Sequence, residues 1–167
     1  MRSRGTRRLA LAALLVTVML MLGYVESLVP TGVPGVKLGL SNSVLILAIV
    51  WLGVPWAVGL MLAKVLLSAF LFSGVGAMLY ALAGGVLSLA AMCLLYRMKG
   101  FSLVTVAVAG AVLHNVGQVC MAMLILKTAG LVYYMGVLML VGAVTGFVTG
   151  TAARILVKRI PESMLPR

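Results

Sequence analysis

The sequence contains no aspartate, and Glu26 and Glu162 are its only acidic residues. Magnesium–diphosphate chemistry, aspartyl-phosphate pumping and hydrolysis by a carboxylate pair all need acidic side chains that this chain lacks. The chain also has no ATP-binding loop and no nucleophile–base pair, so any energy must come from a partner or a gradient. The sequence therefore leans against an enzyme.

Charged residues of both signs are scarce. Only 9% of the 167 residues are charged, 64% are hydrophobic, and the mean hydropathy is +1.26. A soluble domain carries about 25% charged residues. A chain this small cannot bury so much apolar side chain in its own interior, so much of it must face lipid. The composition predicts a membrane protein and excludes a water-soluble globule.

Potential metal ligands are also few. The two cysteines, Cys93 and Cys120, lie in apolar stretches, and neither has C-x-x-C or Cys/His spacing. We expect both to be packing residues. With a single histidine, His114, the chain is expected to hold no intrinsic metal or haem.

Basic residues dominate the charge, which is +11. They lie mostly at the ends of the apolar runs, as the positive-inside rule describes, where they also favour contact with anionic lipid headgroups. Nucleic-acid binding is not expected, because basic faces and stacking platforms need a water-exposed surface. The three groups are residues 2–8 before the first run, Arg97 and Lys99 in the middle, and Arg154, Lys158 and Arg159 after the last.

About six apolar segments approach the length of a membrane span. They predict an all-α polytopic membrane protein, a six-transmembrane-helix bundle forming a single integral membrane domain over 1–167. The second and third are short and are divided at Gly53-Val54-Pro55, where proline can open a helix but not continue one, so a tight helical hairpin is expected. The predicted spans are 9–28, 38–52, 56–72, 75–96, 101–126 and 131–157.

An even number of crossings fits the charge best. Six crossings from a cytoplasmic amino terminus put the three basic groups on the cytoplasmic side and leave only Lys37 and Lys127 outside. Five would put the basic tail outside. The first run is long for a signal peptide and lacks a small-x-small cleavage site, so it is kept as a span. We expect a multi-pass protein of the bacterial cytoplasmic membrane with both termini in the cytoplasm.

The segment 29–37 contains two prolines and two glycines and cannot be a regular helix. It either folds back over the outer side of the bundle or serves as an ordinary connecting loop.

Polar residues in or beside the apolar runs carry the functional prediction, because such groups are costly in a membrane and usually face the bundle interior. A rise of about 1.5 Å per residue places six of them at similar depth on the outer side, with Lys64 near the midplane. They predict a ligand pocket that opens outward. The predicted ligand-binding residues are Glu26, Lys37, Asn42, Lys64, His114, Asn115 and Gln118.

Helical spacing puts Gly110, His114 and Gln118 on one face, where the glycine allows close approach of a helix or ligand. An interhelical hydrogen bond of His114 is the structural alternative. The series Gly84–Gly85 and Gly142, Gly146, Gly150 is expected to make helix contacts.

The charged members leave alternatives open. Glu26 and Lys37 could pair with each other. Lys64 would then have no acid to neutralise it and must snorkel, lose its proton or meet an anionic group of a ligand.

Four strings together resemble one family: Glu26-Ser27, 34–42 (PGVKLGLSN), 83–85 (AGG) and 111–118 (AVLHNVGQ). They resemble the Gx transporter family, also called heptaprenyl diphosphate synthase component I, over nearly the whole chain. More distantly, the plan is similar to the S components of energy-coupling factor vitamin transporters. That resemblance implies a membrane subunit that captures a small molecule from outside and docks on a membrane coupling subunit driven by ATPases.

The resemblance also implies a docking surface of small alanines on the first helix. Ala10, Ala12 and Ala13 are available, but the A-x-x-x-A spacing is not met. The family's synthase name conflicts with the absence of aspartate, so the chain is not a catalytic prenyl diphosphate synthase.

Two functions remain open. A solute-binding transport subunit predicts an enclosed outward-facing pocket. A non-catalytic membrane subunit of prenyl diphosphate or quinone metabolism, or of flavin-based electron export, predicts a lateral groove facing lipid, with a bound quinone or flavin and a neighbouring redox or prenyl-synthesis protein as partner.

Overall fold

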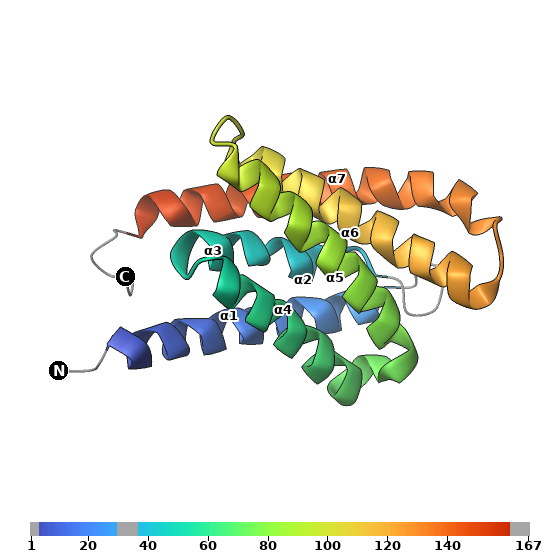
Figure 1. Ribbon diagram of the computed structural model, residues 1–167, viewed down its shortest axis with the longest axis horizontal. Helices are drawn as coiled ribbons and strands as arrows, with labels where there is room; N and C mark the ends of the chain where they lie inside the picture. The colour runs from blue at the N-terminus through green and yellow to red at the C-terminus, as the bar shows by residue number, and fades with distance from the viewer. Residues whose placement is uncertain (1–3, 30–36, 161–167) are drawn as a thin grey trace.

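The computed structural model describes residues 4–29 and 37–160. These residues form helices and no strand, as the sequence predicts. The helices run back and forth along the long axis of the molecule, and α1 begins at the same end at which α7 finishes (Figure 1). The elements are α1 Arg4–Ser27, α2 Leu40–Ser43, α3 Leu45–Trp51, α4 Val54–Ser68, the π-helical turn η1 Ala69–Ser73, α5 Gly74–Arg97, α6 Leu103–Leu126 and α7 Leu131–Arg159.

Four helical segments of the described chain are long and apolar enough to cross a membrane: Gly5–Ser27, Val54–Arg97, Leu103–Leu126 and Leu131–Arg159. This finding supports a membrane protein but counts fewer spans than the six expected. One of the two missing spans is accounted for by Val54–Arg97, whose 44 residues would extend about 66 Å as one straight helix, twice the hydrocarbon thickness. The segment is not straight, because Gly74 leaves helical geometry (φ 76°, ψ 161°) and the chain reverses there (Figure 1).

The second predicted span, 38–52, is not one helix. It consists of the short helices α2 and α3, separated at Val44, and its apolar part is too short to count as a span. The pair runs through the middle of the bundle, in contact with α1, α4, α6 and α7 (Figure 1). Five successive apolar residues, Leu45–Ile49, are all buried. A helix that is apolar on all sides can be surrounded either by protein or by lipid. Its sequence alone therefore does not distinguish a buried central helix from a membrane span.

The tight turn between α3 and α4 was predicted correctly. Pro55 lies in the first turn of α4, where a missing N–H costs nothing, and Gly53 before it has a φ of 91° that favours glycine. The π-helical turn η1 was not predicted, because π-helices have no strong sequence signature.

Glycines let the last three long helices approach one another, as predicted. A Cβ on Gly117 of α6 would lie 2.8 Å from the Ala83 carbonyl oxygen of α5. A Cβ on Gly146 of α7 would lie 2.7 Å from Val108 Cα of α6. These distances leave no room for a side chain, so the glycines set the helix separation. Large apolar side chains such as Phe70, Leu124 and Leu140 cover the outside, as expected for contact with lipid.

Charge is divided between the two ends of the bundle. The start of α1, the turn after Arg97 and the end of α7 lie toward one end, whereas the turn at Lys127 lies at the other (Figure 1). The described residues of the three basic groups therefore share one end, as an even number of passes would require. The predicted fold-back of the outer loop concerns residues 30–36, which lie outside the described part.

Candidate functional site

Lys37 and Gln118 join two distant strings of the sequence. The Lys37 N–H donates to Gln118 Oε1 at 2.8 Å, and Gln118 Nε2 donates to the Lys37 carbonyl oxygen at 3.3 Å. Both residues are buried. A side-chain amide that satisfies both backbone groups of one residue acts as a substitute for a strand or helix partner. The chain entering α2 is thereby fixed against the middle of α6.

Glu26, at the end of α1, accepts two hydrogen bonds from the start of α2. The Leu40 N–H donates to Oε1, and the Ser41 hydroxyl donates to Oε2 at 3.0 Å. The carboxylate thus accepts hydrogen bonds from donors in the first turn of α2, where backbone N–H groups have no partner within the helix. Within the described residues Glu26 makes no ion pair with Lys37, so the pairing we considered possible is not formed.

Two glycines bring backbone against the polar face of α6. Gly39 has a φ of 91°, and a Cβ there would lie 3.4 Å from His114 Cδ2 and 3.5 Å from Asn115 Oδ1. A Cβ on Gly84 of α5 would lie 2.6 Å from the His114 carbonyl oxygen and 2.9 Å from Gln118 Cγ. Described residues from all four strings that carry the family resemblance are therefore joined by contacts.

Several polar atoms at this place have no hydrogen-bond partner among the described residues. Asn42 has neither amide atom paired, and Asn115 lacks a partner at Oδ1, although Asn115 Nδ2 donates to the Leu138 carbonyl oxygen at 2.7 Å. The His114 imidazole lies against the Gly84 backbone of α5 and interacts with it. The three side chains are each 2% exposed or less. Buried polar groups are nearly always satisfied, because an unpaired one costs about 1–3 kcal/mol. The unpaired atoms mark a polar cluster with unused bonding capacity.

The lysines add positive charge to this cluster. Lys64 of α4 is buried and interacts electrostatically with Glu26, Lys37 and His114. Lys37 donates from Nζ to the Ser73 hydroxyl at 2.5 Å and lies 4.8 Å from the Phe72 ring centre. Burial lowers the pKa of Lys37, and the Glu26 carboxylate offsets part of that shift. Two lysines therefore lie in the electrostatic field of one carboxylate, and neither forms an ion pair with it among the described residues.

The structure joins Lys37 to Gln118 and Glu26 to the start of α2, and it sets Gly39 of the same segment against His114 and Asn115. Asn42 and Lys64 are buried on α2 and α4. We call this set of residues the polar cluster. Sequence reasoning missed three serines: Ser41 on Glu26, Ser73 on Lys37, and Ser88, which is buried with an unpaired hydroxyl. Ser88 lies four residues after Gly84 and so on the same face of α5, a spacing that could have found it. The polar cluster is defined as Glu26, Lys37, Asn42, Lys64, Ser88, His114, Asn115 and Gln118.

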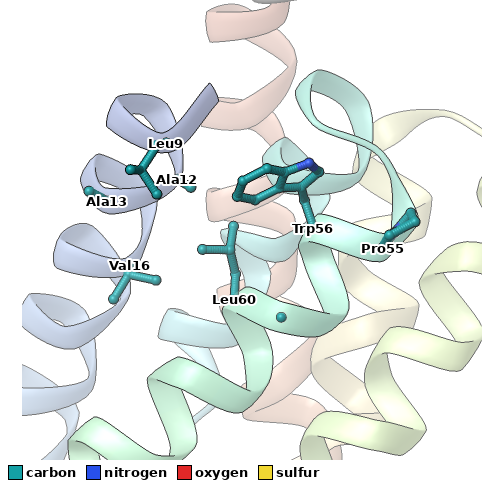
Figure 2. Close-up of a pocket in the computed structure, with 8 residues that line it drawn as sticks. Leu9, Ala12, Ala13, Val16, Pro55, Trp56 and Leu60 are labelled. Atoms are coloured by element: carbon teal, nitrogen blue, oxygen red, sulfur yellow. The ribbon is translucent and has the colours of Figure 1, made fainter. Parts of the chain in front are cut away.

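Three cavities lined by described residues lie away from the polar cluster. One is an apolar groove of about 430 Å³ between α1 and α4, where Leu9 and Val16 face Trp56 and Leu60 (Figure 2). Of the alanines expected to form a docking surface, Ala12 and Ala13 line this groove. A second cavity, of about 610 Å³, lies between α6 and α7, and a third borders Cys120 and the turn at Lys127.

The apolar helices and the enclosed polar cluster indicate a helical membrane protein. Residues 15–156 match the family model of heptaprenyl diphosphate synthase component I, and the chain belongs to that family. No curated protein matches the chain, and no solved structure does. The family inferred from the sequence strings is therefore confirmed, whereas the similarity to S components remains an expectation.

Proposed function

We propose that the chain is the solute-binding subunit of a membrane transport system, and that the polar cluster binds a small molecule with an anionic group. The partner would be a membrane coupling subunit, as in the S-component systems that the sequence resembles. A family named as a component is in keeping with a partner subunit.

The observation that carries this proposal is the unpaired amide of Asn42. Both of its polar atoms are buried without a partner among the described residues, as is Asn115 Oδ1. A ligand with hydrogen-bond donors and acceptors would satisfy these atoms and recover the cost of burying them. If no ligand bound there, an apolar side chain at position 42 would give a more stable protein than an asparagine whose amide is buried and unpaired.

The anionic group follows from the charge of the cluster. Glu26 is bound to the start of α2, and two lysines share its field. The Lys37 ammonium contacts the Ser73 hydroxyl and the Phe72 ring, whereas Lys64 has no hydrogen-bond acceptor among the described residues. A carboxylate or phosphate of the solute would balance Lys64 by a charge-assisted hydrogen bond.

Access from outside requires the six-pass topology. Counting α2–α3 as one pass and α4 and α5 as separate passes gives six, with the basic groups at the cytoplasmic end. Lys37, a member of the polar cluster, then lies on the outer side. Both termini would be cytoplasmic, and the protein would lie in the bacterial cytoplasmic membrane.

The second candidate is a non-catalytic subunit of prenyl diphosphate or quinone metabolism, or of flavin-based electron export. The groove between α1 and α4 favours it, because all eight of its lining residues are apolar (Figure 2). An isoprenoid chain fits such a lateral groove by its chemistry. Under this candidate the cofactor would be a bound quinone, or a flavin.

Mass spectrometry of small molecules that co-purify with the detergent-solubilised protein separates the two candidates. Asn42→Leu removes the unpaired amide at similar volume, and Gly59→Leu fills the groove from a position where a Cβ meets nothing within 4 Å. A polar anion lost from Asn42→Leu but kept in Gly59→Leu supports the transport subunit. An isoprenoid compound lost only from Gly59→Leu contradicts it and supports the second candidate.

Reconstitution tests the partner. Alone in liposomes, the protein should bind its solute but not accumulate it against a gradient, since the sequence has no energy-coupling motif. Accumulation driven by a proton or sodium gradient would instead make it a secondary transporter.

A further inference from the structure

The cavity between α6 and α7 changes character along its length. On α7, Phe147, Thr151 and Arg154 follow at helical spacing on one face. The facing wall belongs to α6. Its Val108 lies at the same end of the cavity as Phe147, and Ser102, just before α6 begins, lies at the same end as Arg154. The cavity of about 610 Å³ is therefore apolar toward the bundle centre and polar and basic toward the bundle end.

The packing of the two helices explains why this cavity exists beside them. A Cβ on Gly150 would lie 3.0 Å from Val104 Cα, so the backbones of α6 and α7 touch at that level. The larger side chains of both helices then stand to the side of the contact and border the cavity. Because its walls are helices joined by close backbone contact, the cavity is a preformed feature.

We propose that this cavity binds one anionic glycerophospholipid of the surrounding bilayer. Its phosphate would lie at Arg154, and an acyl chain would run along Phe147 and Val108. A guanidinium binds a phosphate with two parallel hydrogen bonds, and an apolar wall takes the chain at the depth where acyl chains lie.

Two observations favour a negatively charged lipid as the ligand of this cavity. The bundle end that carries Arg154 also carries Arg97, Lys99, Lys158 and Arg159, so its field attracts anionic headgroups. The polar wall lies toward the bundle end and the apolar wall toward the bundle centre, which matches the headgroup and acyl chains of a phospholipid in the bilayer. A free phosphate ion would have no use for the apolar wall.

A hydroxyl pair at the polar end can add one donor. Ser102 Oγ accepts the Thr105 N–H at 3.1 Å, and the two hydroxyls share one hydrogen bond of 2.9 Å. Two hydroxyls that share one hydrogen bond keep one further O–H hydrogen between them. Thr151 is different, because its hydroxyl donates to the Phe147 carbonyl oxygen at 2.7 Å.

The test uses the full chain in detergent, titrated with phosphatidylglycerol, phosphatidylcholine or inorganic phosphate, with melting temperature and native mass spectrometry as readouts. Phosphatidylglycerol should remain bound at one molecule per chain and raise the melting temperature, whereas the other two should not. Arg154→Gln should weaken phosphatidylglycerol binding by about tenfold or more.

The matched control is Arg159→Gln, which removes the same charge from the same helix end but does not border the cavity. It should keep nearly full binding of phosphatidylglycerol. Equal losses in Arg154→Gln and Arg159→Gln would overturn the proposal in favour of a diffuse surface charge. Stabilisation by inorganic phosphate, or equal binding of phosphatidylcholine, would also overturn it. Because the polar cluster is unchanged in both variants, these outcomes are independent of solute binding.

Discussion

Gln118 on α6 and Lys37 before α2 hold each other by two hydrogen bonds across 81 positions of sequence. This contact, together with the Glu26 carboxylate on Leu40 and Ser41, attaches the short central helices to α1 and α6. Asn42 lies on α2, directly after these anchors. The placement of the polar cluster therefore depends on side chains that lie far apart in the chain.

Removing the Gln118 amide tests this attachment. Gln118→Ala leaves the buried Lys37 N–H and carbonyl oxygen unpaired, so the free energy of unfolding should fall by about 1–3 kcal/mol. Thermal unfolding in detergent measures the loss. Thr17→Ala is the control, since Thr17 is exposed on α1 and its hydroxyl only bonds the Ala13 carbonyl oxygen; its effect should stay within about 0.5 kcal/mol. Equal melting temperatures for the two variants would mean that the hydrogen bonds between Gln118 and Lys37 do not stabilise the fold.

Gly84 tests the close contact of α5 with His114. In Gly84→Ala the new Cβ would lie 2.6 Å from the His114 carbonyl oxygen, so we expect destabilisation by about 1–3 kcal/mol. Gly76→Ala is a matched control on the same helix, because a Cβ there meets nothing within 4 Å. It should be neutral or stabilise by up to about 1 kcal/mol through the better helix propensity of alanine. The contact is misplaced if both variants change the melting temperature in the same direction.

Cysteine labelling tests the membrane topology. In a background of Cys93→Ala and Cys120→Ala, an impermeant maleimide added from outside should label Thr128→Cys and miss Gly100→Cys. Both positions are exposed and lie in the turns at opposite ends of α6. The positive-inside rule is the physical reason, because Arg97 and Lys99 flank the turn that should stay in the cytoplasm. Labelling of Gly100→Cys alone would reverse the orientation.

The sequence singles out buried polar residues but does not give their contacts. Counting residues along each span places Glu26, Asn42 and His114 at similar depth, because the helical rise is nearly constant. Depth does not give rotation or neighbours, so the binding of Glu26 to the start of α2 could not be derived. A possible pair with Lys37 was the simplest alternative, since opposite charges near each other in sequence suggest it. The break at Val44 was missed for a related reason. An apolar run has the same composition whether lipid or protein surrounds it.

The small residues were predicted as contacts because glycine spacing on a helix reports close approach directly. Cavities have no such signal. The groove between α1 and α4 and the cavity between α6 and α7 arise where neighbouring helices diverge, which depends on packing of the whole bundle.

Lys64 offers the most direct test of the proposed solute site, once mass spectrometry has identified the solute. The measurement is the solute-induced rise in melting temperature of Lys64→Met compared with wild type, with His114→Ala beside it. If Lys64 binds the anionic group, Lys64→Met should fold but bind the solute more weakly by about 1.5–3 kcal/mol, and His114→Ala should lose about 0.5–1.5 kcal/mol. At a solute concentration near the wild-type Kd, the solute-induced shift would then nearly vanish in Lys64→Met, because the stabilisation depends on the ratio of the solute concentration to Kd. An unchanged shift in a Lys64→Met protein that is itself more stable than wild type would contradict the proposed site, since it would show Lys64 to be only a costly buried charge.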